Sequence, residues 1–253
     1  MNAKDPITVL PTDTAVSQRA ARELLSSIEQ AQRSFGVASV VLTGGTIGIQ
    51  VLRDVRAFVE NGFTEADFSK VEFWFGDERF VARASDERNE KQAREALLDH
   101  VGVPEDRIHA MGAAGEFETV EEAAEAYARE LTAHAAADST LPRFDVLLLG
   151  MGPDGHIASL FPGTGLIDAQ GLTTAVRDSP KPPPERVSLT RSTISSAREV
   201  WLVVTGEGKA DPVAAAFAGE PADVVPAGAV AGVESTRWFL DEAAHSKAAE
   251  RGA

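Results

Sequence analysis

Apolar positions along the chain follow two spacings, one typical of buried strands and one typical of helices. Nearly continuous apolar runs predict strands at residues 37–42, 71–75, 144–149 and 200–205. Between these runs, apolar residues recur every three or four positions, as they do on the core-facing side of a helix. The longest such stretch is residues 15–35, and Gly36 is suited to its C-terminus. Strands and helices that alternate in this way predict parallel β-α-β units.

The remaining segments fit the same class. We predict further helices at residues 47–61, 85–101, 119–136 and 213–217, and further strands at residues 172–176, 187–190 and 238–240. No internal repeat or inter-domain linker is evident. We therefore expect an α/β fold, a Rossmann-like, open, mostly parallel sheet with helices on both faces, in a single domain over residues 1–253.

Glycine-rich or polar turns follow four of the predicted strands. They occupy residues 43–46, 76–79, 150–159 and 206–209. In a parallel sheet the carboxyl ends of the strands share one edge, and ligands bind beyond it. We therefore expect these four turns to build one site. The proline-rich segment 179–184 is interpreted as a stiff, exposed connector.

Asp154 and His156 lie two residues apart in the turn after the strand at 144–149. An imidazole has a reference pKa of about 6.5, which suits proton transfer near neutral pH. A carboxylate beside it can orient the ring. We predict that His156 is a general base and that Asp154 is its partner. The competing interpretation is a glycine-rich turn with a structural histidine, and the position at a strand end argues against it.

A phosphate monoester is the ligand that the turns fit best. Gly44, Gly45 and Thr46 would stand at the N-terminus of the following helix, where their backbone N–H groups would form an anion site. Neither a dinucleotide fingerprint nor a nucleotide-triphosphate loop is present in the sequence. Lys209 and Arg79 follow strand ends and can supply positive charge, and Arg191 is a third, less well placed candidate.

Composition narrows the classes of partner. The formal net charge of −15 argues against nucleic acid and against an anionic membrane surface. The absence of cysteine excludes disulfides and thiolate metal sites, and it fits a reducing compartment. No apolar run is long enough for a membrane span, and no secretory leader is recognisable, so we expect a cytoplasmic protein. We expect no metal, because no His/Asp/Glu grouping has metal-ligand spacing, and we expect surface or structural roles for His100, His109, His134 and His245.

The motifs, in their order along nearly the whole chain, resemble those of the 6-phosphogluconolactonase family, which belongs to a superfamily with the glucosamine-6-phosphate deaminases. The matching segments are residues 43–46, 74–81, 85–89, 150–162, 186–190, 204–210 and 238–241. The deaminases typically carry Asp-Glu-Tyr at positions 77–79 and Phe-Asn-Glu-Pro at positions 159–162. This chain has Asp-Glu-Arg and Ser-Leu-Phe-Pro there, as expected for the lactonases.

Two positions depart from the family pattern. The glycine loop usually continues Ser-x-Pro, where this chain has Thr46-Ile47-Gly48, and the Leu-Thr pair is usually followed by an apolar residue or Pro, where this chain has Arg191. These departures concern the shape of the sugar site and the role of Arg191. They do not concern the reaction class. Two alternatives to the lactonase are kept: an amino-sugar-phosphate isomerase or deaminase, which the missing Phe-Asn-Glu argues against, and a non-catalytic sugar-phosphate sensor, which only the altered loop suggests.

The resemblance implies a reaction and roles for the site residues. The reaction would be hydrolysis of 6-phospho-D-glucono-1,5-lactone to 6-phospho-D-gluconate, without a cofactor. His156 would activate water, Asp154 would orient the imidazole of His156, and Asp77 would make a secondary polar contact. The turn at residues 43–46, Arg79 and Lys209 would hold the phosphate and the carboxylate-like end of the sugar. We expect a monomer, with a dimer as the alternative.

Overall fold

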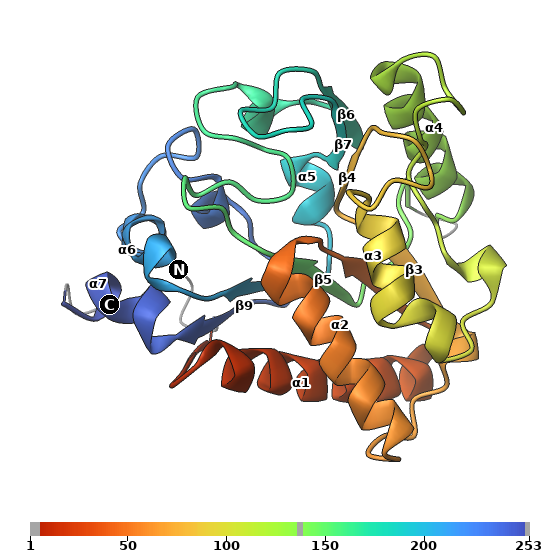
Figure 1. Cartoon of the computed structure of the whole chain (residues 1–253), viewed down its shortest axis with the longest axis horizontal. Helices are drawn as coiled ribbons and strands as arrows, with labels where there is room; N and C mark the ends of the chain where they lie inside the picture. Colours follow the sequence, from red (N-terminus) through yellow and green to blue (C-terminus); the bar gives the residue numbers. More distant parts are fainter. Residues whose placement is uncertain (1–5, 136–138, 251–253) are drawn as a thin grey trace.

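The structure, a computed structural model, describes residues 6–135 and 139–250. Within these residues six parallel strands form the main sheet (Figure 1). Their order is β1 (Ile7–Leu10), β9 (Ser235–Asp241), β8 (Glu199–Val204), β5 (Val146–Leu149), β2 (Ala38–Leu42) and β3 (Val71–Phe75). Every residue of β2 and β5 is buried, which explains why these strands are unbroken apolar runs.

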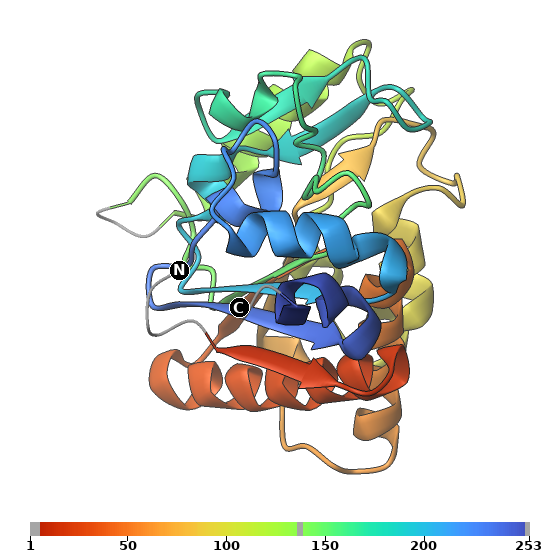
Figure 2. The same ribbon diagram turned by 90° about the vertical axis from the view of Figure 1, so that its left-hand side faces the viewer.

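The order of the strands reverses between β2 and β5. From β2 the chain passes through α2 (Gly45–Glu60) to β3 on one side, whereas β5, β8 and β9 extend the sheet on the other. Parallel crossovers are right-handed, so opposite directions place the connecting helices on opposite faces. Accordingly α1 (Asp13–Phe35) and α6 (Ala210–Phe217) lie on different sides of the sheet (Figure 2). The predicted mostly parallel sheet with helices on both faces is confirmed.

A smaller antiparallel sheet, which the sequence analysis did not predict, adjoins the main one. It contains β4 (Asp77–Arg79), β7 (Arg186–Leu189) and β6 (Thr173–Val176), and α4 (Val120–Ala133) packs against it (Figure 1). The predicted turn at residues 76–79 is therefore mostly strand. At Gly76 the chain leaves β3, and the Gly76 N–H donates to Leu42 O at 2.9 Å before β4 begins.

Most helix boundaries differ from prediction by one to three residues, and the largest difference is in the helix expected over residues 85–101. The helix expected over residues 85–101 is α3, Asn89–Ala96, because Arg88 is extended and its buried guanidinium bonds to backbone carbonyls of residues 111 and 112. The helix expected over 119–136 begins as predicted, with the Thr119 side chain accepting from Glu122 N, and ends at Ala133. Residue 136 lies outside the described residues.

Several short elements were not predicted. They are β1, α5 (Arg191–Ile194), α7 (Glu242–Glu250) and the 3₁₀ helices Phe68–Lys70, Leu98–His100, Glu105–Arg107, Leu166–Asp168, Glu207–Lys209 and Pro226–Ala229. Such segments have too few residues to show the apolar spacing that marks a helix or a strand. Within the described residues, no helix combines the length and the apolar character that a membrane span requires.

Candidate active site

A cavity of about 540 Å³ opens at the carboxyl edge of the main sheet. The turns after β2, β5 and β8 line one side of it, and residues from β4, β7 and the segment before β7 line the other. The cavity lies where the strand order reverses, which is the usual ligand position in open α/β sheets. The four turns predicted to build one site therefore do meet.

The turn after β5 is shaped by a close approach of its own backbone to His156. Gly152 N donates to His156 O at 2.9 Å, and Gly155 N donates to Gly152 O at 3.0 Å. A Cβ atom on Gly152 would lie 1.9 Å from His156 Nδ1 and 2.3 Å from Asp154 Oδ1. Only glycine at position 152 leaves room for these two side chains as they are placed here.

His156 and Asp154 form a directly hydrogen-bonded pair. His156 Nδ1 lies 2.5 Å from Asp154 Oδ1, and the imidazole packs on the Phe161 ring with centroids 4.4 Å apart. His156 lines the cavity, whereas Asp154 lies behind it. Because Asp154 accepts from Nδ1, the second ring nitrogen, Nε2, is left with its lone pair for a ligand. This arrangement is the one that a general base requires.

The pKa values of both partners are lowered. Burial lowers the pKa of His156 and outweighs the opposite effect of Asp154, and the nearby Lys181 charge lowers it further. For Asp154, burial acts to raise the pKa, but the hydrogen bond and charge of His156 and the charge of Lys181 more than offset it. His156 is therefore neutral, and Asp154 ionised, at neutral pH.

Lys181 is a site residue that the sequence analysis missed. Its Nζ lies 3.4 Å from His156 Nδ1 and 3.5 Å from Asp154 Oδ1, and both Lys181 and Pro182 line the cavity. The proline-rich segment was interpreted as an exposed connector, but it also forms a wall of the site. Arg186 fixes this wall by donating to the carbonyls of Lys181, Pro182 and Pro183.

The N-terminus of α2 lies on the cavity. Gly44 is its N-cap, and neither a capping side chain nor an acidic residue in the first turn competes for its N–H groups. Gly44, Gly45 and Thr46 all line the cavity. A Cβ on Gly44 would meet Asn89 Oδ1 at 1.9 Å, so glycine is needed for α2 and α3 to come this close. The predicted anion site is thus open to a ligand.

Asp77 and Arg79 reach the cavity from β4 and are held by Asn89. Asn89 Nδ2 donates to Asp77 Oδ1 at 3.1 Å, and its Oδ1 accepts from the Arg79 guanidinium. The other oxygen of Asp77 accepts from Ser159 Oγ at 2.7 Å. Asn89 also lines the cavity and was not predicted as a site residue. Its partners lie ten and twelve residues earlier, which no short motif reveals.

Lys209 and Arg186 complete the positive lining of the cavity. Lys209 Nζ donates to Met151 O at 2.5 Å, and burial lowers its pKa. Burial also lowers the pKa of the Arg186 guanidinium, which stays cationic. Among the described residues that line the cavity, the charged side chains are Arg79, Lys181, Arg186 and Lys209 against the single carboxylate of Asp77. In a chain of net charge −15, this is a local inversion of charge.

Arg191 does not reach the cavity. It begins α5, its Nη2 lies 3.3 Å from Asp168 Oδ1, and it is not among the residues that line the cavity. Arg191 was a candidate because it follows the strand predicted at residues 187–190. Since β7 is antiparallel to β4, its first residue, Arg186, faces the cavity, and Arg191 follows its far end.

Comparison with known proteins identifies the family. The profile of glucosamine-6-phosphate isomerases/6-phosphogluconolactonase matches residues 11–238. The 6-phosphogluconolactonase of Mycobacterium leprae is 48% identical over 231 residues, which cover 90% of this chain and 92% of that protein. The 6-phosphogluconolactonase of Mycobacterium tuberculosis is 45% identical over 244 residues, covering 95% and 97%. The chain belongs to the glucosamine-6-phosphate isomerase/6-phosphogluconolactonase family.

A solved structure agrees with this assignment. The 6-phosphogluconolactonase of Thermotoga maritima superposes with a TM-score of 0.82 at 26% identity, covering 94% of this chain and 100% of that one. Both sequence relatives and this structural neighbour carry the name of the lactonase branch of the family.

Proposed function

We propose that this protein is a 6-phosphogluconolactonase, which hydrolyses 6-phospho-D-glucono-1,5-lactone to 6-phospho-D-gluconate. The observation that carries the proposal is a neutral, carboxylate-oriented imidazole in a cavity whose charged lining is four cations and one carboxylate. An anionic sugar phosphate fits that lining, and the imidazole supplies the base for ester hydrolysis. The names of the relatives support the same reaction.

In the proposed mechanism His156 activates water. As the water oxygen attacks the lactone carbonyl carbon, His156 Nε2 takes one of its protons, and Asp154 stabilises the resulting imidazolium through Nδ1. The carbonyl becomes a tetrahedral oxyanion, which the positive lining of the cavity favours. When the bond from this carbon to the ring oxygen breaks, the proton on His156 passes to the leaving oxygen. The products are a free hydroxyl and a carboxylic acid, which keeps the second proton of the water and then loses it to solvent to become the carboxylate; no cofactor takes part.

The phosphate is proposed to bind away from the reacting carbon. The N–H groups at the start of α2, together with Arg79 and Lys209, form the part of the lining suited to an anion with several oxygens. These contacts are the same before and during the reaction. They therefore contribute binding energy and position the ring rather than changing the chemical step.

The first test compares the wild type with His156→Ala in hydrolysis of lactone generated in situ, measured against the spontaneous background. We expect the wild type to accelerate the reaction. The variant should lose a factor of roughly 10² or more in kcat, the typical contribution of a general base. Circular dichroism and the melting temperature should show that the variant is folded.

Other results would overturn the proposal. Near-wild-type turnover by His156→Ala would remove this residue from the mechanism. A wild type that does not exceed the background but releases ammonia from glucosamine 6-phosphate would be an isomerase or deaminase. Tight binding of 6-phosphogluconate without turnover of either substrate would indicate a sensor.

We also propose that the protein works as a monomer in the cytoplasm, with a small sugar phosphate as its partner. The net charge of −15 supports the exclusion of nucleic acid and anionic membrane surfaces as partners.

A further inference from the structure

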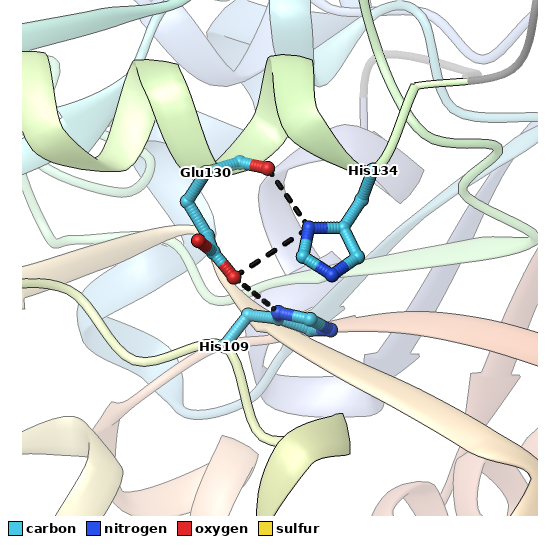
Figure 3. A group of neighbouring side chains, drawn as sticks. All are labelled: His109, Glu130 and His134. Atoms are coloured by element: carbon cyan, nitrogen blue, oxygen red, sulfur yellow. Dashed lines mark hydrogen bonds and ion pairs between the residues drawn. The ribbon is translucent and has the colours of Figure 1, made fainter.

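Three side chains that the proposed reaction does not use meet beside α4, outside the cavity (Figure 3). His109 follows the 3₁₀ helix at Glu105–Arg107, Glu130 lies on α4, and His134 is the C-cap of α4. Glu130 Oε1 lies 2.9 Å from His109 Nδ1 and 3.5 Å from His134 Nδ1. One potential ligand atom from each residue lies within 4.8 Å of the other two. These distances bring the three groups within reach of one metal ion. Residue spacing predicted no such grouping, because His109 lies 21 residues before Glu130.

His109 faces a carboxylate at each of its ring nitrogens. Nε2 lies 2.9 Å from Glu72 Oε2, and Nδ1 lies 2.9 Å from Glu130 Oε1. A neutral imidazole has only one N–H, so it can donate to only one of these acceptors. If Nε2–H donates to Glu72, the lone pair of Nδ1 faces that of Glu130. Either a proton or a metal ion between the two atoms resolves this conflict. A carboxylate on the far nitrogen of a ligating histidine is the common environment of such ligands.

The spacing and donor types favour zinc. In a tetrahedral site with ligand bonds of about 2.0–2.2 Å, neighbouring ligand atoms are about 3.3 Å apart. The two separations from Glu130 Oε1 fall on either side of that value. Ligation through His134 Nδ1 would replace the hydrogen bond that this nitrogen donates to Glu130 O at 3.0 Å. Glu130 and His134 are four residues apart at the end of one helix, so their side chains lie on the same face. Two imidazoles and one carboxylate suit zinc, whereas calcium and magnesium prefer all-oxygen sites.

One ligand is rigid and two are accessible. The His109 side chain is only 3% exposed and stacks on Trp74 with centroids 3.8 Å apart. The backbone N–H of His109 donates to Phe73 O at 2.8 Å, which fixes the residue against β3. The side chains of Glu130 and His134 are 43% and 42% exposed, so a metal ion can reach them from solvent. This exposure also leaves room for a water molecule as the fourth ligand. Arg107 pairs with the other oxygen of Glu72, so Glu72 is placed to orient His109.

We propose that His109, Glu130 and His134 form a zinc site that ties the C-terminal end of α4 to β3. A second contact already joins these elements, since the Tyr127 hydroxyl of α4 accepts from Phe75 N at 2.9 Å. The strand β3 continues through Gly76 into β4, which carries Asp77 and Arg79 to the cavity. The ion would therefore stabilise the packing of α4 beside the small sheet rather than take part in hydrolysis.

The test is calorimetric titration of the metal-free full chain with zinc. We expect one ion per chain and a higher melting temperature with zinc than with EDTA, because zinc binds the folded state. His134→Ala should weaken zinc binding by roughly 100-fold or more, since even loss of an outer partner costs 10- to 100-fold. His134 is exposed, so this variant should fold, and its melting temperature in EDTA should match that of the wild type.

The matched control is His156→Ala, because Asp154 and His156 could also hold zinc. This variant should keep the wild-type isotherm. Glu72→Gln should weaken binding by roughly 10- to 100-fold, since it removes the negative charge of the group that orients the ligating His109. The proposal is overturned if the wild type binds no zinc, if His134→Ala binds it as tightly as the wild type, or if binding is lost in His156→Ala instead.

Discussion

At the scale of single residues, His156 is defined by what surrounds it. Burial lowers its pKa, Asp154 holds its Nδ1, and Lys181 adds a positive charge 3.4 Å from that nitrogen. Asp154 belongs to the same turn as His156, whereas Lys181 comes from a segment 25 residues later. Because its pKa is lowered, His156 stays neutral at pH values at which a free imidazole is already protonated.

We expect Lys181→Met to move the pH dependence of catalysis. A general base works when deprotonated, so the acid limb of kcat/KM reports the pKa of His156. In the wild type its midpoint should lie below 6.5, the ordinary histidine value, because burial lowers that pKa. Removal of the Lys181 charge raises the pKa, and the midpoint should move to higher pH.

The control for this prediction is Lys181→Arg, which keeps the charge. Its acid limb should stay close to that of the wild type, whatever happens to KM. An acid limb that does not move in Lys181→Met would show that Lys181 does not act on His156 electrostatically.

At the scale of elements, each strand end contributes one part of the site. The turn after β5 carries the His156–Asp154 pair, the start of α2 carries N–H donors, and β4 carries Asp77 and Arg79. The turn after β5 is the most tightly constrained of these, because its backbone passes so close to the imidazole that a side chain at position 152 would collide with it.

Gly152→Ala should therefore damage catalysis more than stability. The added methyl group must displace His156 or Asp154, and a misplacement of about 1 Å can cost roughly 10²-fold in rate. We expect kcat to fall at least about tenfold in the lactone assay while the chain stays folded. Gly208→Ala is the matched control, since a Cβ there meets nothing within 4 Å and Gly208 does not line the cavity. Equal activity of the two variants would contradict the steric argument.

At the scale of the whole molecule, the site exists because two sheets meet. The main sheet supplies the turns, and the small antiparallel sheet supplies Arg79 and Arg186. Positive charge from both sheets is thereby concentrated in one cavity of an acidic chain. A phosphorylated ligand that bridges the two sides should stabilise the whole fold.

We expect 6-phosphogluconate to raise the melting temperature. At about 100 times its dissociation constant a ligand adds about 2.7 kcal/mol, which corresponds to roughly 5–10 °C for a chain of this size. Gluconate at the same concentration lacks the phosphate and should raise it much less. Differential scanning fluorimetry measures both, and equal shifts with the two ligands would argue against a phosphate subsite in the cavity.

Local sequence predicted most of the site but not all of it. Gly44, Gly45, Thr46, Asp77, Arg79, Asp154, His156 and Lys209 were placed by their positions at strand ends, and the structure brings them together around the cavity. Lys181, Arg186 and Asn89 were missed. Arg186 reaches the cavity from an antiparallel sheet whose pairing has no local signal, and Lys181 lies in the segment before that strand. Asn89 begins α3 and reaches the cavity only because α3 packs beside α2. Arg191 was predicted because it follows a strand, but that strand is antiparallel to β4, and Arg191 does not line the cavity.

The amino-acid sequence by itself determined the class of fold, the β5 turn and the start of α2, because apolar periodicity and glycine positions act over a few residues. It also determined the family, through motifs spread over nearly the whole chain. The tertiary structure decided which residues from distant segments share a space. Lys181 beside His156, and His109 beside Glu130 and His134, depend on packing between elements, and the spacing of residues along a chain does not encode such contacts.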